Sequence, residues 1–280
     1  MHLLVDNGGS TATWILARQG NVLHRHRTEG IHPLLVEEAQ MLAICRQVGQ
    51  NFALEAGQLD ALFFYSTGTR NADVRERLRK LLDEAFPGAS AIEVHTDLAA
   101  AARAGCRHTP GIACILGTGS NAGRYDGRRI IASAGGLGYI LGDEGGGAGL
   151  GRRLLGAYLD GRLPHPIRRQ LEEEMHTNPE GIYEGVYRRP HPNRFLASFA
   201  PFLHRHRAQP AVRQLLEEEF TAFLQRYVLP LTGDNALPVH FVGSVAHHFE
   251  AEIRAAGGAL NLDIAGIQPD PMDGLVTYHA

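Results

Sequence analysis

The chain has 280 residues, with 27 basic and 30 acidic side chains and a formal net charge of −3. This near-neutral balance gives no electrostatic reason to expect nucleic acid or a membrane surface as a partner. No apolar stretch approaches the roughly 20 residues that a membrane helix needs, and the N-terminus lacks the basic region and cleavage site of a secretory signal. Three cysteines, none in a CxxC pair, indicate a reducing compartment. We therefore expect a cytoplasmic globular protein with one large or two medium domains.

The first third of the chain reads as alternating strands and helices. A glycine turn over residues 6–11 and a Gly20-Asn21 hairpin signal separate the first three strands. Pro33 is predicted to open the first helix, and Asp97 can cap the third. The predicted elements are, in chain order, strands at 3–5, 13–17 and 22–27, a helix from 33, a strand at 62–65, a helix at 72–85, a strand at 92–94 and a helix at 98–104.

The pattern then restarts. Strands are predicted at 112–116, 122–125 and 129–132, around a second glycine turn and an Asp126-Gly127 hairpin signal. When Gly117 is placed on Asp6, both glycine turns, both hairpin turns and all three strands align. We therefore predict a duplicated domain core in which each half contributes a β-hairpin loop to a shared cleft.

The remainder of the chain is predicted to be mostly helical. The boundary between domains is expected at residues 105–110, which gives domains 1–108 and 109–280, with the last helix packing back on the first domain. The predicted elements are a loop at 135–151, helices at 152–160, 166–175, 194–205, 212–228 and 246–256, and strands at 239–242 and 262–264.

The glycine turns could bind phosphate. Lys80 is the only lysine and lies in glycine-free, helix-like sequence, which excludes a P-loop. Successive N–H groups in a glycine turn can instead form a nest for an anion. The alternative is a dinucleotide fold, because Gly117-Thr118-Gly119 followed by Gly123 approximates G-x-G-x-x-G. That fingerprint needs a helix after the turn, and here a strand and a hairpin follow.

These motifs resemble the actin-like ATPase superfamily over nearly the whole chain, within it the BadF/BadG-type group and specifically the N-acetylglucosamine kinase-like proteins. The resemblance implies an α/β fold of two actin-like (ribonuclease H-like) domains, with a duplicated βββαβαβα core and an interdomain cleft. The segments that carry it are two phosphate motifs at 6–10 and 117–121, the strand and helix at 94–104, the long glycine loop at 135–145, the adenosine motif at 242–246, and stretches at 192–199 and 272–276.

The resemblance implies a phosphotransferase that uses ATP and Mg²⁺ to phosphorylate an amino sugar hydroxyl, with N-acetylglucosamine the leading candidate. It implies Asp97 as the catalytic base, and Asp6 as the residue that orients Mg²⁺, through water. A homodimer is compatible with it. The other implied contacts are Asp6, Gly8, Gly9, Ser10, Thr11, Gly117, Thr118, Gly119 and Ser120 for the ATP phosphates, Gly243 and Ser244 for adenosine, and His32, Asn121, Gly138, Asp143 and Glu144 for the sugar.

Two departures from the family pattern leave an alternative open. Thr11-Ala12 stands where members usually carry Lys-Thr, and His32 stands where the sugar-contacting asparagine is usual. A histidine cannot reproduce the paired donor and acceptor of an amide. The alternative is therefore a non-kinase ATPase or a nucleotide-binding regulatory protein of the same superfamily. Asp97 could equally serve only as an N-cap. The 15 histidines are interpreted as solvated surface, because none forms a metal-binding pattern.

Overall fold

The computed structural model describes residues 1–9, 11–233 and 236–280. It divides into two compact units, Met1–His108 together with Pro271–Ala280, and Thr109–Asp270. Each unit holds a five-stranded sheet. The strand order is β3-β2-β1-β4-β5 in the first unit and β8-β7-β6-β9-β10 in the second, so the two sheets correspond strand for strand. In both, three antiparallel strands are followed by two parallel ones. The predicted fold, a duplicated actin-like core, is confirmed.

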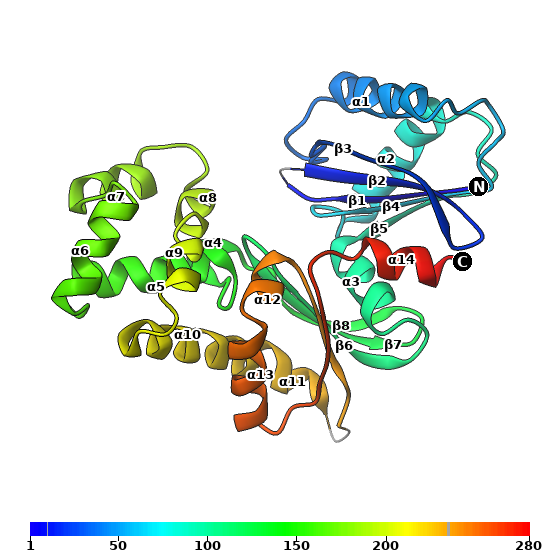
Figure 1. Ribbon diagram of the computed structural model, residues 1–280. Coiled ribbons are helices and arrows are strands. Elements are labelled where there is room, and N and C mark those ends of the chain that lie inside the picture. The colour runs from blue at the N-terminus through cyan, green and yellow to red at the C-terminus, as the bar shows by residue number, and fades with distance from the viewer. Residues whose placement is uncertain (10, 234–235) are drawn as a thin grey trace. The chain divides into compact units, whose positions relative to one another are not determined.

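The first unit is a sheet between two layers of helices (Figure 1). Apolar side chains of β1 and β2 alternate between its faces: Trp14 packs toward α1 and α2, while Leu4 and Ile15 pack toward α3 and α14. The elements are β1 (His2–Asn7), β2 (Thr11–Arg18), β3 (Asn21–Glu29), α1 (Glu38–Asn51), β4 (Ala61–Ser66), α2 (Ala72–Ala85), β5 (Ile92–Thr96), α3 (Asp97–Gly105) and α14 (Met272–Tyr278).

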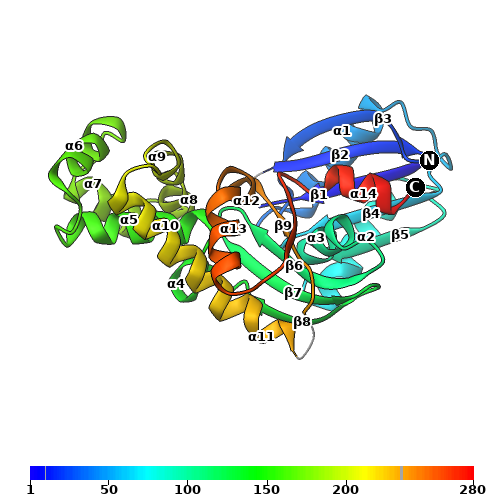
Figure 2. The ribbon, with the colours of Figure 1, turned by 60° about the horizontal axis from the view of Figure 1, so that its bottom comes forward.

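The second unit repeats the sheet and inserts helices between its third and fourth strands. In this insertion α5 packs against α8, α9 and α10, and α11 lies beside β7 and β8 (Figure 2). The elements are β6 (Pro110–Leu116), β7 (Ser120–Asp126), β8 (Ile130–Gly135), α4 (Gly138–Leu141), α5 (Gly147–Leu159), α6 (His165–Glu174), α7 (Pro179–Tyr187), α8 (Pro192–Ala197), α9 (Ala200–Arg205), α10 (Pro210–Phe223), the π-helix η1 (Leu224–Val228), α11 (Leu229–Thr232), β9 (Val239–Val242), α12 (Ser244–His248), α13 (Glu250–Ala259) and β10 (Ile264–Gln268).

Several predicted elements were wrong in their bounds. The first helix begins at Glu38 rather than at Pro33, because the His32 carbonyl accepts the N–H groups of Leu35 and Val36 in a separate turn. The glycine-rich segment predicted as a loop contains α4 and the start of α5. Helix α7 was not predicted, and the helices predicted at 194–205 and 246–256 are each broken into two. Over the described residues, none of the helices combines the length and apolar character of a membrane span.

Candidate active site

The parallel strands of the first unit end together. β1, β4 and β5 pair in register, so that Asn7, Ser66 and Thr96 form one row across the sheet. The segments that follow these residues therefore leave the same edge of the sheet, as is usual for ligand sites in α/β folds. These segments are the first glycine turn, the loop that begins at Thr67, and helix α3, which begins at Asp97.

Asp97 is the first residue of α3. It is not the cap of this helix, because the Thr96 hydroxyl accepts the N–H of Ala99 at 3.2 Å in that role. One carboxylate oxygen, Oδ1, accepts the N–H of Leu98 at 2.8 Å. Burial raises the pKa of Asp97, while the hydrogen bond from Leu98 and the charge of Arg70 oppose that rise. A carboxylate whose pKa is raised accepts a proton more readily, which suits a general base.

Asn7 joins the strand ends to the loop that carries His32. Its side-chain amide donates to the Ile31 carbonyl at 3.1 Å and to Ser66 Oγ at 2.8 Å, and its Oδ1 accepts the Ile31 N–H at 2.9 Å. Asn7 is fully buried, so that these bonds satisfy polar groups that water cannot reach. Sequence reasoning did not single out Asn7, although it lies between two predicted site residues.

His32 lies over the end of β4. The Leu34 N–H donates to His32 Nδ1 at 3.2 Å, so Nδ1 is an acceptor and the proton of the neutral ring is on Nε2. Burial lowers the pKa of His32, which favours this neutral form. A Cβ on Gly68 would lie 2.9 Å from the ring, and Gly68 has a φ of +75°. The ring therefore packs on a position where only glycine fits, and it presents Nε2–H as a donor.

The first glycine turn is open. The Gly8 N–H donates to the Thr11 carbonyl at 3.0 Å, and the Gly9 and Thr11 residues are exposed. Asp6, at the end of β1, is half-buried. Ser10, predicted as a phosphate contact, lies outside the described residues. Arg70, in the loop between β4 and α2, bears a charge close enough to act on Asp97.

The second glycine turn is braced by its neighbours. The Gly147 and Ala148 N–H groups of α5 each donate at 2.8 Å to the carbonyls of Gly117 and Thr118. These carbonyls point toward α5, and the Thr118 and Gly119 N–H groups find no acceptor among the described residues. Ser120 Oγ is also buried without a hydrogen-bond partner in the described part of the chain. Unpaired donors in a glycine turn are what an anion nest requires.

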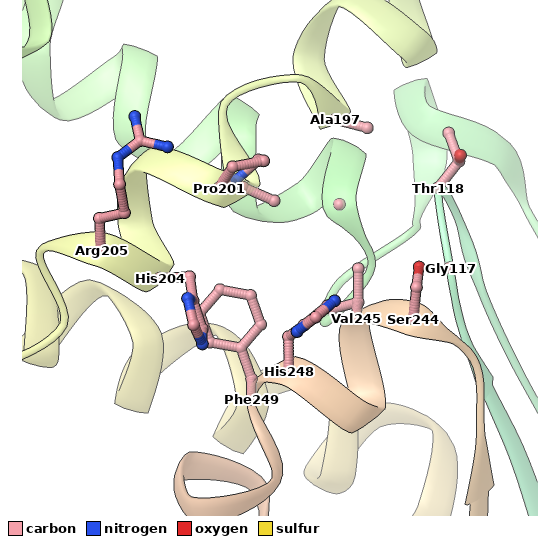
Figure 3. A pocket seen from close by; sticks show the side chains of 12 residues that line it. Gly117, Thr118, Ala197, Pro201, His204, Arg205, Ser244, Val245, His248 and Phe249 are labelled. Carbon is pink, nitrogen blue, oxygen red and sulfur yellow. The ribbon is translucent and has the colours of Figure 1, made fainter. Parts of the chain in front are cut away.

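A cavity of about 460 Å³ adjoins this turn within the second unit (Figure 3). Gly117, Thr118 and Ser244 line one end, and the rings of His204 and Phe249 lie toward the other. The lining residues are Gly117, Thr118, Gly147, Ala197, Ala200, Pro201, His204, Arg205, Ser244, Val245, His248 and Phe249. The cavity thus joins a donor-rich turn to an apolar and aromatic wall, which is the combination that a nucleoside phosphate needs.

Of the histidines interpreted as solvated surface, two line this cavity: His248 is exposed, as interpreted, whereas His204 is partly buried. The His204 ring lies 5.5 Å, centroid to centroid, from both His248 and Phe249. Burial lowers the pKa of His204, and the charges of Arg207 and His248 lower it further. The two rings come from α9 and α12, which are distant in sequence. No local pattern could have indicated that they meet.

Gly243 lets the adenosine motif approach the second turn. It has a φ of +128°, and a Cβ there would lie 2.3 Å from the Leu116 carbonyl oxygen. Its N–H donates to the Gln268 carbonyl at 2.9 Å. The strand ends of β6, β9 and β10 are thereby brought together, as those of the first unit are.

Asp143 and Glu144 differ in surroundings. The buried Asp143 carboxylate lies behind the second turn, where Oδ1 accepts the Ser120 N–H at 3.1 Å, and burial raises its pKa. Glu144 Oε2 accepts the Tyr227 hydroxyl at 2.6 Å, and Oε1 pairs with Arg226 at 2.5 Å. Burial acts to raise the pKa of Glu144, but these partners hold it below its usual value.

The comparisons with known proteins decide the family. The chain is similar to a candidate N-acetylglucosamine kinase from Porphyromonas gingivalis, with 40% identity, a TM-score of 0.93, and coverage of 100% of this chain and 98% of that one. The chain belongs to the N-acetylglucosamine kinase-like family. This family membership confirms the resemblance expected from the glycine motifs, and with it the place of the chain among sugar kinases of the actin-like ATPase fold.

More distant structures share the fold of this kinase-like family. A candidate N-acetylglucosamine kinase from Chromobacterium violaceum is 23% identical, with a TM-score of 0.76 and coverage of 100% of this chain and 98% of that one. A hexokinase of the ROK family from Thermus thermophilus is 14% identical, with a TM-score of 0.59 and coverage of 99% and 96%. No family model matches the chain, and a comparison with curated proteins found no relative.

The predicted site residues of this kinase-like chain fall into one group in each unit. Asp6, Gly8, Thr11, His32 and Asp97 share one sheet edge in the first unit. The second unit holds the others around its glycine turn and the loop that follows β8, and these are Gly117, Thr118, Gly119, Ser120, Asn121, Gly138, Asp143, Glu144, Gly243 and Ser244.

Proposed function

We propose that this protein transfers the γ-phosphoryl group of ATP to a hydroxyl of an amino sugar, with N-acetylglucosamine the leading candidate. The observation that carries the proposal is the cavity of the second unit. Its lining includes Thr118, whose N–H has no acceptor among the described residues. The identity of 40% to a candidate N-acetylglucosamine kinase supports this choice of sugar.

The second unit would hold the nucleotide. Its phosphates would accept the N–H groups of Thr118 and Gly119, and the base and ribose would enter the cavity past Ser244 toward His204 and His248. The unpaired Ser120 hydroxyl fits a ligand that brings additional oxygen acceptors to this turn. These donors would stabilise the charge that the phosphates carry during transfer.

The first unit would hold the acceptor. The attacking hydroxyl gives its proton to the Asp97 carboxylate as its oxygen bonds to the γ-phosphorus, and the bond between that phosphorus and the bridging oxygen of ADP breaks. His32 would donate Nε2–H to a sugar oxygen. His32 would thereby supply the donor half of the pairing that an asparagine gives in relatives, and the acceptor half would have to come from elsewhere.

Magnesium would be held mainly by the nucleotide. Mg²⁺ in kinases is bound by one or two carboxylates together with substrate phosphates and water, so a preformed cluster of three protein ligands is not needed. Asp6, half-buried at the end of β1, fits the role of the carboxylate that orients it through water. Bound Mg²⁺ would neutralise charge on the phosphates during transfer.

The test is ADP release from MgATP across a panel of sugars. We expect release to be stimulated by N-acetylglucosamine and less by glucose, N-acetylmannosamine or galactose. A matched reaction without sugar measures the basal ATPase rate. ADP release that no sugar changes would contradict the kinase proposal, and it would favour a non-kinase ATPase of the same superfamily.

A further inference from the structure

A short π-helix lies beneath the glycine-rich loop of the second unit. η1 (Leu224–Val228) continues α10, and its buried Tyr227 reaches the segment that follows β8. The Tyr227 ring lies 3.6 Å from where a Cβ would stand on Gly135, and its hydroxyl lies 2.9 Å from the corresponding point on Gly142. Tyr227 therefore reaches the loop at its start, Gly135, and again at Gly142. π-Helical turns are rare and frequently occur at functional sites.

Glu144 connects the loop to this helix through both carboxylate oxygens. Oε2 accepts the Tyr227 hydroxyl at 2.6 Å, and Oε1 pairs with Arg226 at 2.5 Å. Arg226 also donates to the Leu141 carbonyl at 3.1 Å, and Arg152 donates to the Gly142 carbonyl at 3.0 Å. We call these four side chains, Glu144, Tyr227, Arg226 and Arg152, the loop anchor. With both oxygens engaged, Glu144 is better suited to hold the loop than to bind a sugar.

The loop anchor also supports the strand that carries Asn121. Gly135, on which Tyr227 packs, pairs with Asn121 across β7 and β8, and the Gly136 N–H donates to the Ser120 carbonyl at 3.0 Å. A displacement of Tyr227 would therefore act on Asn121 through Gly135. The loop itself exposes Gly138 at the start of α4, which leaves its backbone accessible to a ligand.

We propose that Tyr227 and Arg226 are positioning residues that act through Glu144 to hold the 135–146 loop and Asn121 in the conformation that binds the sugar. This inference rests on the proposed function for its substrate, and it assigns Glu144 to the anchor in place of the sugar contact expected from the resemblance. Neither η1 residue needs to touch the sugar. Their effect comes from preorganisation, because a loop that is already ordered loses less conformational freedom on binding.

The chain offers a matched control for the hydroxyl of Tyr227. Tyr158 is equally buried, donates to Glu172 at 2.7 Å, and has Arg168 beside that carboxylate. This second Tyr–Glu–Arg group joins α5 to α6, away from the loop. Tyr227→Phe and Tyr158→Phe therefore remove the same kind of bond, and only the first removes it from the loop anchor.

Hydrogen exchange of the loop amides tests the anchor without reference to activity. In Tyr227→Phe we expect peptides over 136–146 to exchange about tenfold faster than in the wild type, as loss of a charge-assisted hydrogen bond predicts. In Tyr158→Phe they should exchange at the wild-type rate. Unchanged exchange in Tyr227→Phe would overturn the anchor, whether or not the protein phosphorylates a sugar.

Steady-state kinetics then test the positioning of the sugar. In Tyr227→Phe, and in Glu144→Gln as a second variant, we expect the sugar KM to rise about tenfold while the ATP KM and the melting temperature stay near wild type. A rise of both KM values together, or a loss of stability with an unchanged sugar KM, would reduce the anchor to a structural role. If the wild type phosphorylates no sugar, the proposed function fails and the exchange result still stands.

A second-site variant sharpens the same test. In Gly142→Ala the new Cβ would lie 2.9 Å from the Tyr227 hydroxyl oxygen and 3.0 Å from Leu137 Cβ, so the hydroxyl must move. We expect Gly142→Ala to raise the sugar KM, and Tyr227→Phe to offset part of that rise in the double variant, because it removes the crowded atom. Strictly additive effects would contradict direct coupling between Gly142 and Tyr227.

Discussion

The two glycine turns follow the same strand order but are built differently. In the first unit the Gly8 N–H donates to the Thr11 carbonyl, and Gly9 is exposed. In the second unit the start of α5 donates to the turn, and the Asp143 carboxylate accepts from it. A Cβ on Gly146 would stand 2.6 Å from the carbonyl carbon of Gly119.

This difference follows from what was inserted after the third strand. Between β3 and β4 the chain forms a single helix, α1, whereas between β8 and β9 it forms α4 to α11. The inserted helices brace the second turn and wall its cavity. The two cores therefore differ in the groups that they offer: the first has Asp97, an acid whose pKa is raised, and the second has N–H groups at Thr118 and Gly119 with no acceptor among the described residues.

The largest expected effect is on the acid of the first unit. Asp97→Asn should retain the fold and nucleotide binding but lose ~10²–10⁴ in the rate of phosphoryl transfer, because an amide cannot accept the proton. Single-turnover kinetics with MgATP and sugar measure the loss. Asp83→Asn, an exposed change on α2, is the control. Turnover of Asp97→Asn at the wild-type rate would remove Asp97 from the mechanism.

Alanine at one glycine of each unit should change the stability of the protein to different extents. Gly146→Ala is expected to destabilise the protein by ~1–3 kcal/mol, because the Cβ collides with the Gly119 backbone. Gly9→Ala should leave stability unchanged, because its Cβ meets no described atom within 4 Å. Urea denaturation of both variants measures this contrast. Equal losses of stability would show that the first turn is braced as firmly as the second.

A lysine at position 11 tests what a positive charge in the first glycine turn does to ATP affinity and turnover. Thr11 is exposed at the start of β2, at the position where the family pattern usually has a lysine. A charge-assisted hydrogen bond is worth ~1.5–3 kcal/mol, so Thr11→Lys should raise ATP affinity or turnover about tenfold. Steady-state kinetics with MgATP measure the change. Lower activity would indicate that another cation, with Arg70 the candidate beside Asp97, already fills this role.

The smallest expected effect concerns acid stability of the first unit. His279 Nε2 lies 2.7 Å from the Tyr65 hydroxyl, and burial lowers the pKa of His279 to about 3. The neutral ring therefore contributes stability above its unfolded pKa of roughly 6.5, and this contribution is lost as the pH falls from there toward 3. Urea denaturation at pH 7 and pH 5 should show a smaller loss for His279→Gln than for the wild type. An equal loss would mean that other groups govern acid unfolding.

The features that could be predicted from the sequence are short motifs that occur in both halves of the chain. Two glycine turns, two hairpin signals and three aligned strands were enough to predict the duplicated core, whereas the site residues were predicted from the family resemblance. Asn7, His204 and Tyr227 could not be found in this way, because each acquires its role from contacts with segments distant in the chain. Pro33 misled the prediction because it packs near the Gly68 end of β4 instead of beginning a helix.

The central claim is that the phosphoryl group of ATP reaches a sugar. ³¹P NMR of a reaction containing MgATP and N-acetylglucosamine tests this claim directly, with Asp97→Asn as the matched control. We predict a sugar phosphate ester resonance that grows in step with ADP in the wild type and does not appear over the same time in the variant. Inorganic phosphate in place of the ester, or an ester formed equally by the variant, would contradict the account.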